Sequence, residues 1–381
     1  MKRHVKEIVI TGGPCSGKSE ALKIIPKRLR DMGYTVMILR EVAEDIFSSV
    51  FPANAGDIRE FLKKYLEKFY AMEEQIFLEI MAKLEIRRSL ARICGNEKTV
   101  ILLDRGPMDA LAYMPSKSFL EFVRRSGFSI YDARDSFGGV AHLVTAADGA
   151  EEFYEQNEVR IETAEEARIL DKETQWAWAG APHLWIIDNS TGFDGKMNRL
   201  FEAILHILGE PEPLEIEKKF LLAKRPDFRN SILRRVEMFL IEQIYLSDGM
   251  SRIRKRSTVR YGRGRSQGDS TCYYMTRKIE ISPGVRREEE SIISCYDYAS
   301  LKDRKDLHRR VVRKHRYCFV YNNQYFELDT FISPQWARGM WILELELLNM
   351  NDSIDLPPFL DIEKEVTADP AYSNYEIARR R

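Results

Sequence analysis

Three short runs in the second half of the chain constrain its fold most, because charged side chains alternate along each of them. The runs are 215–219 (EIEKK), 252–254 (RIR) and 344–346 (ELE). Residues two apart on a strand share a face, which groups these charges: Glu215, Glu217 and Lys219; Arg252 and Arg254; Glu344 and Glu346. Such charges are costly to bury unless cations and anions meet. The pattern predicts a closed β-structure whose interior binds a metal-complexed polyphosphate.

Composition excludes few classes of protein. At 381 residues the chain is long enough for two domains. Its 59 Lys and Arg balance its 59 Asp and Glu, so net charge gives no general argument for nucleic-acid or membrane binding. Without a spanning apolar run or a leader segment, we expect no membrane partner and a cytoplasmic location. The five cysteines lack paired spacing and fit reduced thiols: Cys15, Cys94, Cys272, Cys295 and Cys318.

Residues 1–208 alternate strand-like with helical stretches. Strands are expected at 7–11, 34–39, 99–104, 140–145 and 184–188, and helices such as 19–31 and 58–92 lie between them. Strands separated by helices imply right-handed crossovers and parallel pairing. We therefore predict an α/β domain with a parallel sheet between two helical layers.

The pattern changes at 209–213 (GEPEP), where a glycine and two prolines predict a linker. Residues 214–381 form the second predicted domain, whose strand-like runs are 214–222, 235–246, 250–261, 271–281, 286–293, 310–321, 324–331 and 341–348. Eight strands with inward charge can close into a barrel around a polar ligand. The apolar spacing of 232–246 would also suit a helix, but its strand-like neighbours favour a strand.

Residues 12–19 follow the pattern G-x-x-x-x-G-K-[ST] between an apolar strand and a helical run. They are Gly12, Gly13, Pro14, Cys15, Ser16, Gly17, Lys18 and Ser19. The glycines let the loop fold around phosphate, so that backbone amides and the helix N-terminus face the anion. We expect Lys18 to neutralise phosphate charge and Ser19 to bind Mg²⁺. The motif predicts binding of ATP or GTP.

A second apolar strand ends at Asp104. A carboxylate there, near the phosphate loop, suits a second magnesium contact or a base for an acceptor hydroxyl. The alternative is that Asp104 caps the next helix. Glu41 and Glu44 follow the preceding strand and either face an acceptor substrate or lie on the surface.

Arg160 and Arg168 flank an acidic helical segment. They either close over the nucleotide phosphates as part of a lid or are solvated on the helix surface.

At these residues the first domain resembles P-loop kinases of the nucleoside and nicotinamide riboside kinase type, in an ATPase-like group often fused to a second phosphate enzyme. The resemblance covers most of 5–205. It is carried by the phosphate loop, by 104–106 (DRG) and by 144–150 (VTAADGA). It implies a nucleotide partner and leaves the acceptor open.

Further strand-like runs in the second domain extend the charge pattern. They add Lys278; Arg286, Glu288 and Glu290; Lys314 and Arg316; Glu327 and Asp329. A single charged run is usually a solvated face, but solvated faces mix signs without this order. Carboxylates suit hard divalent cations, and arginine forks match phosphate oxygens. Together they predict hydrolysis of a terminal phosphate.

The ordered charges, which end at 365–367 (EVT), resemble the CYTH or triphosphate tunnel metalloenzyme superfamily over about 214–376. The resemblance implies an α+β domain built on an eight-stranded antiparallel β tunnel. It implies Mg²⁺ or Mn²⁺ ligands at Glu215, Glu217, Glu288, Glu290, Asp329, Glu344 and Glu346. It implies phosphate contacts at Lys219, Arg252, Arg254, Lys278, Arg286, Lys314, Arg316 and Lys364. The residues expected to take part in catalysis are Glu215, Glu217, Lys219 and Glu346, with Asp104 in the first domain.

These features predict a metal-dependent triphosphatase joined to a nucleotide-binding, kinase-like domain. Its substrate is expected to be tripolyphosphate, thiamine triphosphate, a nucleoside triphosphate or an RNA 5′-triphosphate. The basic stretch 256–270 either contacts a large substrate such as RNA or is a flexible loop. Two alternatives stay open: an adenylate cyclase of the class IV type, and a regulatory module that senses polyphosphate. The sequence leaves the oligomeric state open.

Overall fold

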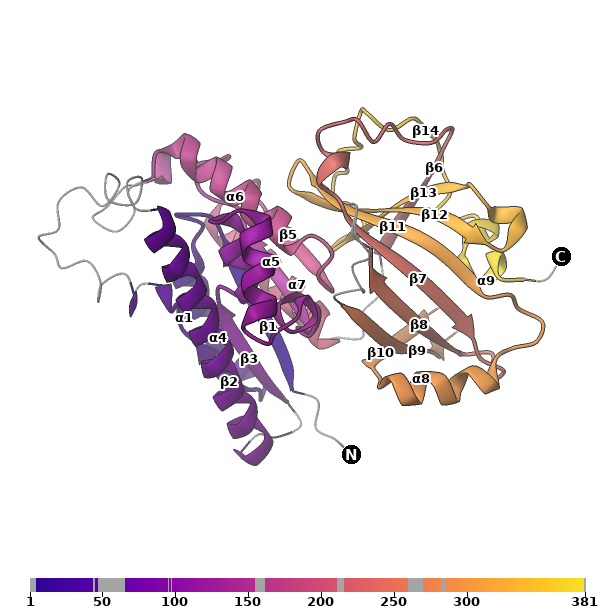
Figure 1. Cartoon of the computed structure of the whole chain (residues 1–381), viewed down its shortest axis with the longest axis horizontal. Coiled ribbons are helices and arrows are strands. Elements are labelled where there is room, and N and C mark those ends of the chain that lie inside the picture. Colours follow the sequence, from indigo (N-terminus) through magenta and orange to yellow (C-terminus); the bar gives the residue numbers. More distant parts are fainter. Residues whose placement is uncertain are drawn as a thin grey trace, which may run out of the picture. The chain divides into compact units, whose positions relative to one another are not determined.

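The computed structural model describes residues 5–43, 45–46, 66–94, 96, 98–154, 162–210, 216–259, 270–282 and 285–379. The chain forms two compact units, Met1–Leu208 and Gly209–Arg381 (Figure 1). Each unit has its own sheet, and each is described by itself below.

The first unit contains a five-stranded sheet in the order β2-β3-β1-β4-β5, with every pair parallel. The strands are β1 (Lys6–Gly12), β2 (Thr35–Leu39), β3 (Thr99–Asp104), β4 (Gly139–Leu143) and β5 (Leu184–Ile187). Every residue of β3 is buried, as expected for a strand covered on both faces. The predicted parallel α/β fold is confirmed.

Helices flank this sheet (Figure 1). They are α1 (Lys18–Asp31), α4 (Leu66–Cys94), α5 (Ser116–Arg125), α6 (Ala164–Trp178) and α7 (Gly192–Leu208), with short helices η1 (Pro107–Ala112), η2 (Tyr131–Asp135) and η3 (Glu151–Phe153). Helix α1 packs against α7, while α4 and α6 both pack against η1. The helix predicted at 19–31 is confirmed. The one predicted at 58–92 is described from Leu66 onward, and its earlier residues lie outside the described part of the chain.

The second unit contains an antiparallel sheet in the order β10-β9-β8-β7-β11-β12-β13-β6-β14. The strands are β6 (Ile216–Leu222), β7 (Glu237–Tyr245), β8 (Ser251–Thr258), β9 (Thr271–Ser282), β10 (Val285–Ile292), β11 (Val312–Tyr321), β12 (Gln324–Ser333), β13 (Trp341–Leu347) and β14 (Ile362–Glu365). The antiparallel sheet is confirmed, and so is a strand within 232–246. The sheet has nine described strands where the sequence predicts eight, because β14 is too short to show an alternating pattern.

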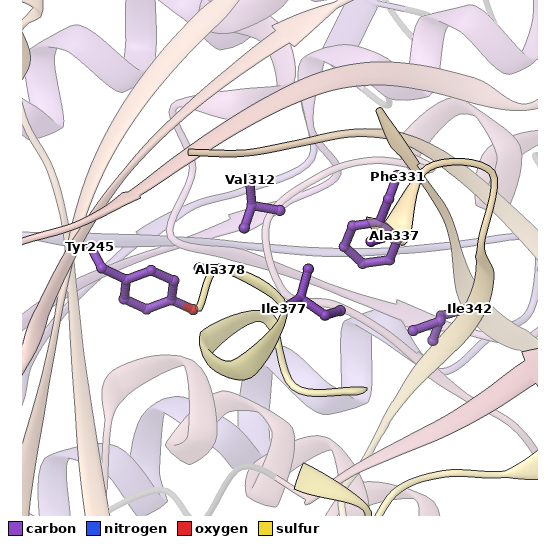
Figure 2. Close-up of a cluster of buried hydrophobic side chains, with 7 residues drawn as sticks. All are labelled: Tyr245, Val312, Phe331, Ala337, Ile342, Ile377 and Ala378. Atoms are coloured by element: carbon purple, nitrogen blue, oxygen red, sulfur yellow. The ribbon is translucent and has the colours of Figure 1, made fainter. Parts of the chain in front are cut away.

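Short helices lie between these strands: η4 (Leu233–Arg235), α8 (Cys295–Leu301), η5 (Lys302–Arg304) and η6 (Gln335–Ala337). Two more follow β14: η7 (Pro370–Tyr372) and α9 (Asn374–Ile377). Helix α9 brings Ile377 and Ala378 into an apolar cluster with Tyr245, Val312, Phe331, Ala337 and Ile342. Figure 2 shows Ile377 and Ala378 beside Tyr245, Val312, Phe331 and Ile342 from the strands. The described helices contain no stretch that is long and apolar enough to cross a membrane.

We predict that Ile377→Ala destabilises the second unit by about 2–4 kcal/mol, because it leaves a cavity at a fully buried position. Urea denaturation measures the loss. Met350→Ala is the control, since Met350 is 78% exposed and should change stability by less than about 0.5 kcal/mol. Equal effects of the two substitutions would contradict the packing of α9 into the sheet.

We predict that His206 makes the first unit less stable in acid. His206 on α7 packs against Trp185, and burial with the nearby His183 lowers its pKa from 6.5 to about 4. The unfolded chain therefore binds the proton first, so stability is fully present above about pH 6.5 and is lost as pH falls toward 4. His206→Gln should reduce the difference between unfolding free energies at pH 7 and pH 5. An unchanged difference would refute the assignment.

Candidate functional site

The phosphate loop connects β1 to α1 and depends on glycine at two positions. Gly12 has φ 152° and Gly17 has φ 91°, conformations that residues with a Cβ rarely adopt. A Cβ on Gly12 would lie 2.1 Å from the carbonyl oxygen of Leu143 on β4. The loop is therefore packed closely against the carboxyl end of the sheet, which is where α/β proteins bind ligands.

Lys18, the first residue of α1, is buried and faces the loop itself. Its Nζ donates to the carbonyl oxygens of Gly12 at 2.9 Å and Gly13 at 3.0 Å, and to Oγ of Ser16 at 3.1 Å. Burial and the charge of Arg105 lower the pKa of Lys18 to about 8. Lys18 is thus a cation whose hydrogen-bond partners are neutral, and an incoming phosphate would supply the missing charge. Ser19 follows it in the first turn and is exposed.

Asp104 ends β3 close to Lys18. It is 7% exposed, and its Oδ1 has no hydrogen-bond partner among the described residues. Burial, together with the charge of Glu41, raises the pKa of Asp104 to about 6. Asp104 does not cap the next helix, because Gly106 is the N-cap of η1. An unpartnered buried carboxylate beside the phosphate loop fits a metal ion or an acceptor hydroxyl.

The residues around Asp104 include Asp109 and Glu73, which were not singled out by the sequence. Arg105 pairs through Nε with Oε1 of Glu41 at 2.7 Å. Asp109 accepts hydrogen bonds from Oγ1 of Thr11 and, at 2.6 Å, from Nε1 of Trp178. Glu73 on α4 is buried, and desolvation raises its pKa to about 8. These groups surround the end of β3 with titratable side chains.

Two further buried residues support the loop from α6 and α7. Asp171 accepts the N–H of Gly13 at 2.8 Å. Lys196 donates to the carbonyl oxygen of Ser16 at 3.0 Å and to that of Val144 at 2.6 Å. Single polar residues within amphipathic helices carry no recognisable sequence signal, which is why neither was predicted.

Of the two arginines predicted to form a lid, Arg168 lies in the described part of the chain. Arg160 lies outside the described residues, as does Glu44. Arg168 pairs with Glu165 on its own helix at 3.0 Å and donates to the carbonyl oxygen of Ala147 at 2.6 Å. In this conformation Arg168 is bonded to its own helix and to the segment after β4.

In the second unit, acidic and basic side chains of neighbouring strands form one ion-pair network. Lys219 on β6 contacts Glu217 at 2.7 Å and Glu344 on β13 at 2.9 Å. Arg316 on β11 contacts the other oxygen of Glu344 at 2.6 Å. The network extends to β12, where Arg316 pairs with Glu327 and Asp329, and Lys314 pairs with Asp329.

The network determines the protonation of its carboxylates. Burial opposes ionisation of Glu344, but Lys219, Lys314 and Arg316 hold its pKa well below the ordinary value. Glu217 behaves in the opposite way, because burial and the charge of Glu344 raise its pKa. The cations therefore stabilise an anionic Glu344, and Glu217 is the carboxyl that protonates more easily.

Glu346, two residues further along β13, is the exception. It forms no ion pair or hydrogen bond with the described residues. The side chain of Glu346 is exposed to solvent but is surrounded by protein atoms. This desolvation and the negative charges of Glu327, Glu217 and Glu290 raise the pKa of Glu346 to about 8. Glu290 belongs to β10, at the other edge of the sheet.

The remaining predicted residues lie on β8, β9 and β10. Arg254 contacts Glu290 at 2.9 Å, which also accepts a hydrogen bond from Thr276. Arg252 is half-buried on the same strand as Arg254. Three others belong to β9 and β10, but their side chains lie outside the described part: Lys278, Arg286 and Glu288. Glu215 also lies outside it.

Two observations bear on which residues can bind a metal ion and which can contact phosphate. Among the described residues, no three His, Cys, Asp or Glu side chains form a ready-made metal site. Glu346 supplies an unpaired carboxylate, and Glu217 lies opposite it in the register of β6 and β13. Lys364 on β14 is exposed and lies over the ring of Tyr372 at 5.4 Å, so it does not join the network.

The charged face of the sheet ends at the apolar cluster of Figure 2. Four residues of that cluster or packed against it stand two positions from a network residue on the same strand and therefore share its face: Leu221 after Lys219, Ile342 before Glu344, Phe331 after Asp329 and Val312 before Lys314. Ile377 and Ala378 fill the space between these strands. The apolar cluster therefore borders the charged face at one end of these strands.

Comparisons with known proteins give a family match and matches among solved structures. Residues 7–196 match a family model described as an AAA domain. A solved structure titled as the inorganic triphosphatase NE1496 is 27% identical and covers 44% of this chain and 97% of its own, with a TM-score of 0.30. A second, titled as the hypothetical protein NE1496, is 29% identical and covers 43% and 97%, with a TM-score of 0.29. A search of curated proteins found no match.

The family match covers the phosphate loop, the buried Lys18 and the strand that ends at Asp104. It extends to Lys196, which supports the loop from α7. Together with the parallel sheet, these observations identify the first unit of the chain as a nucleotide-binding P-loop domain of the AAA family.

Proposed function

We propose that the second unit hydrolyses the terminal phosphoanhydride bond of a triphosphate. The observation that carries this proposal is the inward-facing network of Lys219, Arg316 and Glu344, with the unpaired Glu346 beside it. Cations matched to phosphate oxygens next to a carboxylate suited to a divalent ion are the two requirements of metal-assisted phosphate hydrolysis.

Each residue of the network has a defined task in this proposal. Glu346 and Glu217 hold Mg²⁺ or Mn²⁺, with Glu215 as a further ligand. When bound, the ion withdraws charge from the phosphate oxygens and lowers the barrier to attack by water. Lys219, Lys314 and Arg316 exchange their carboxylate partners for phosphate oxygens and stabilise the charge that develops on the leaving group. Arg252 and Arg254 extend the phosphate-binding surface to β8.

The proposed site suits a substrate that presents its terminal phosphates. Tripolyphosphate, thiamine triphosphate, a nucleoside triphosphate and an RNA 5′-triphosphate all present such an end. The basic stretch 256–270, which lies mostly outside the described residues, is the candidate contact for a larger carrier.

We further propose that the two units are separate domains and that the first transfers phosphate from ATP or GTP to an acceptor. Asp104 is the proposed base or second metal contact, since its Oδ1 is buried without a partner. Glu41 holds Arg105 beside it. The unpartnered Oδ1 of Asp104 at the end of β3 favours an acceptor that brings a hydrogen-bond donor.

We expect the two activities to be lost independently. Glu346→Gln should abolish metal-dependent phosphate release and leave nucleotide binding intact, because it removes the unpaired carboxylate. Lys18→Ala should abolish nucleotide binding and leave phosphate release intact. The measurement is phosphate release from the five triphosphates named by class above, tripolyphosphate, thiamine triphosphate, ATP, GTP and triphosphorylated RNA, beside nucleotide titration.

Glu363→Gln is the control, since Glu363 is an exposed residue of β14. Loss of phosphate release in Lys18→Ala alone would place the hydrolysis in the first unit and overturn the proposal. Pyrophosphate with a cyclic nucleotide, instead of orthophosphate, would assign the site to cyclisation.

We expect substitution of two neighbouring lysines of β6 to have very different effects on kcat/KM. Lys219→Met should lower kcat/KM for tripolyphosphate by roughly 100-fold, because it removes one phosphate-stabilising cation. Lys218→Met is the matched control: Lys218 points to the opposite face and pairs with Glu365 at 2.8 Å. Steady-state kinetics distinguishes the two variants, and similar losses in both would mean that the network is not the site.

A further inference from the structure

A buried carboxylate of α6 is bonded directly to the phosphate loop. Asp171 is 2% exposed, and its Oδ1 accepts the N–H of Gly13 at 2.8 Å and the N–H of Thr145 at 3.0 Å. Nε2 of His142 lies 3.1 Å from the same oxygen, and Nε2 of Gln175 donates to Oδ2 at 2.9 Å. Asp171 therefore joins the loop, the end of β4 and α6 at one point.

The fit between Asp171 and the loop is close. A Cβ on Gly13 would lie 2.6 Å from Oδ1 of Asp171 and 2.8 Å from its Cβ. Such distances are too short for any side chain, so the second glycine of the loop is required by its contact with α6. His142 and the N–H donors outweigh burial and hold the pKa of Asp171 below its ordinary value, so the acceptor is charged.

Helix α6 makes a second connection on the other side of the loop. Trp178 at its last turn donates to Asp109, which accepts a hydrogen bond from Oγ1 of Thr11. Thr11 directly precedes Gly12. The helix therefore holds the chain both just before the loop and within it.

We propose that Asp171 is a positioning residue that holds the phosphate loop in its nucleotide-binding conformation. The carboxylate takes the N–H of Gly13, so that N–H is not a phosphate donor, and Asp171 acts through the shape of the loop. The inference deepens the nucleotide binding of the first unit and rests on it.

The test compares Asp171→Ala with Asp171→Asn in the full-length chain. Calorimetric titration with ATP and GTP in the presence of Mg²⁺ gives affinity, and thermal unfolding without nucleotide gives stability. Asp171→Ala should weaken binding by about tenfold or more, because two N–H groups lose a charged acceptor. Asp171→Asn keeps an acceptor oxygen and should restore most of the affinity.

The negative charge of Asp171, taken alone, predicts the opposite effect on nucleotide affinity. Asp171 is an anion close to the site of a polyanion, so its removal would tighten nucleotide binding if it acted only through its field. Tighter binding in either variant would overturn the proposal. Unchanged affinity with a lower melting temperature would also overturn it and leave a purely structural role.

Two further variants keep the result decisive. Lys172→Ala, an exposed position of the same helix, should change neither affinity nor stability. If Asp171→Ala does not fold, Gly13→Ala tests the same contact from the loop and should weaken binding as well; unchanged binding in Gly13→Ala would overturn the proposal. If the wild type binds neither ATP nor GTP, the nucleotide site itself fails, and the inference fails with it.

Discussion

The second unit depends on opposite charges meeting on one face of its sheet. Lys219 and Arg316 share Glu344 between them, and Asp329 shares Arg316 and Lys314. Removing one partner from a buried pair costs about 3–5 kcal/mol, because the other charge stays buried alone. The network must therefore be complete in the absence of a ligand. In the function proposed above, phosphate would take over the cations and a metal ion would take over the carboxylates.

In the first unit, the lysine of the phosphate loop has no carboxylate among its hydrogen-bond partners. The hydrogen bonds of Lys18 go to neutral carbonyl and hydroxyl oxygens, so its charge is only partly compensated before nucleotide binds. The loop that surrounds it keeps its shape through Asp171 and Lys196, which approach from α6 and α7. In our proposals, the site of the second unit would exchange its ion-pair partners on binding, whereas the loop of the first is held in shape by residues that do not contact the phosphate.

Much of this architecture could be predicted from local patterns. The phosphate loop has a fixed spacing, and the switch from mixed helices and strands to strands alone appears in the order of residues. Asp171, Asp109 and Glu73 could not be predicted, because each is a single polar residue in a helix. Asp171 contacts the phosphate loop only in the folded chain, because 158 residues separate it from Gly13 in the sequence. The unpaired state of Glu346 was equally hidden, since Glu344 two positions away has the same pattern and is fully paired.

The sequence by itself determined which charges share a face, because alternation along a strand depends only on the pleat of the backbone. It also determined the phosphate loop, whose glycines and lysine act within eight consecutive residues. Only the tertiary structure decided which cation meets which carboxylate. That pairing follows from strand order and register, which place Glu344 opposite Lys219. It also decided that Ile377 packs among the strands that carry the network, since neither register nor long-range packing is encoded in any local run of residues.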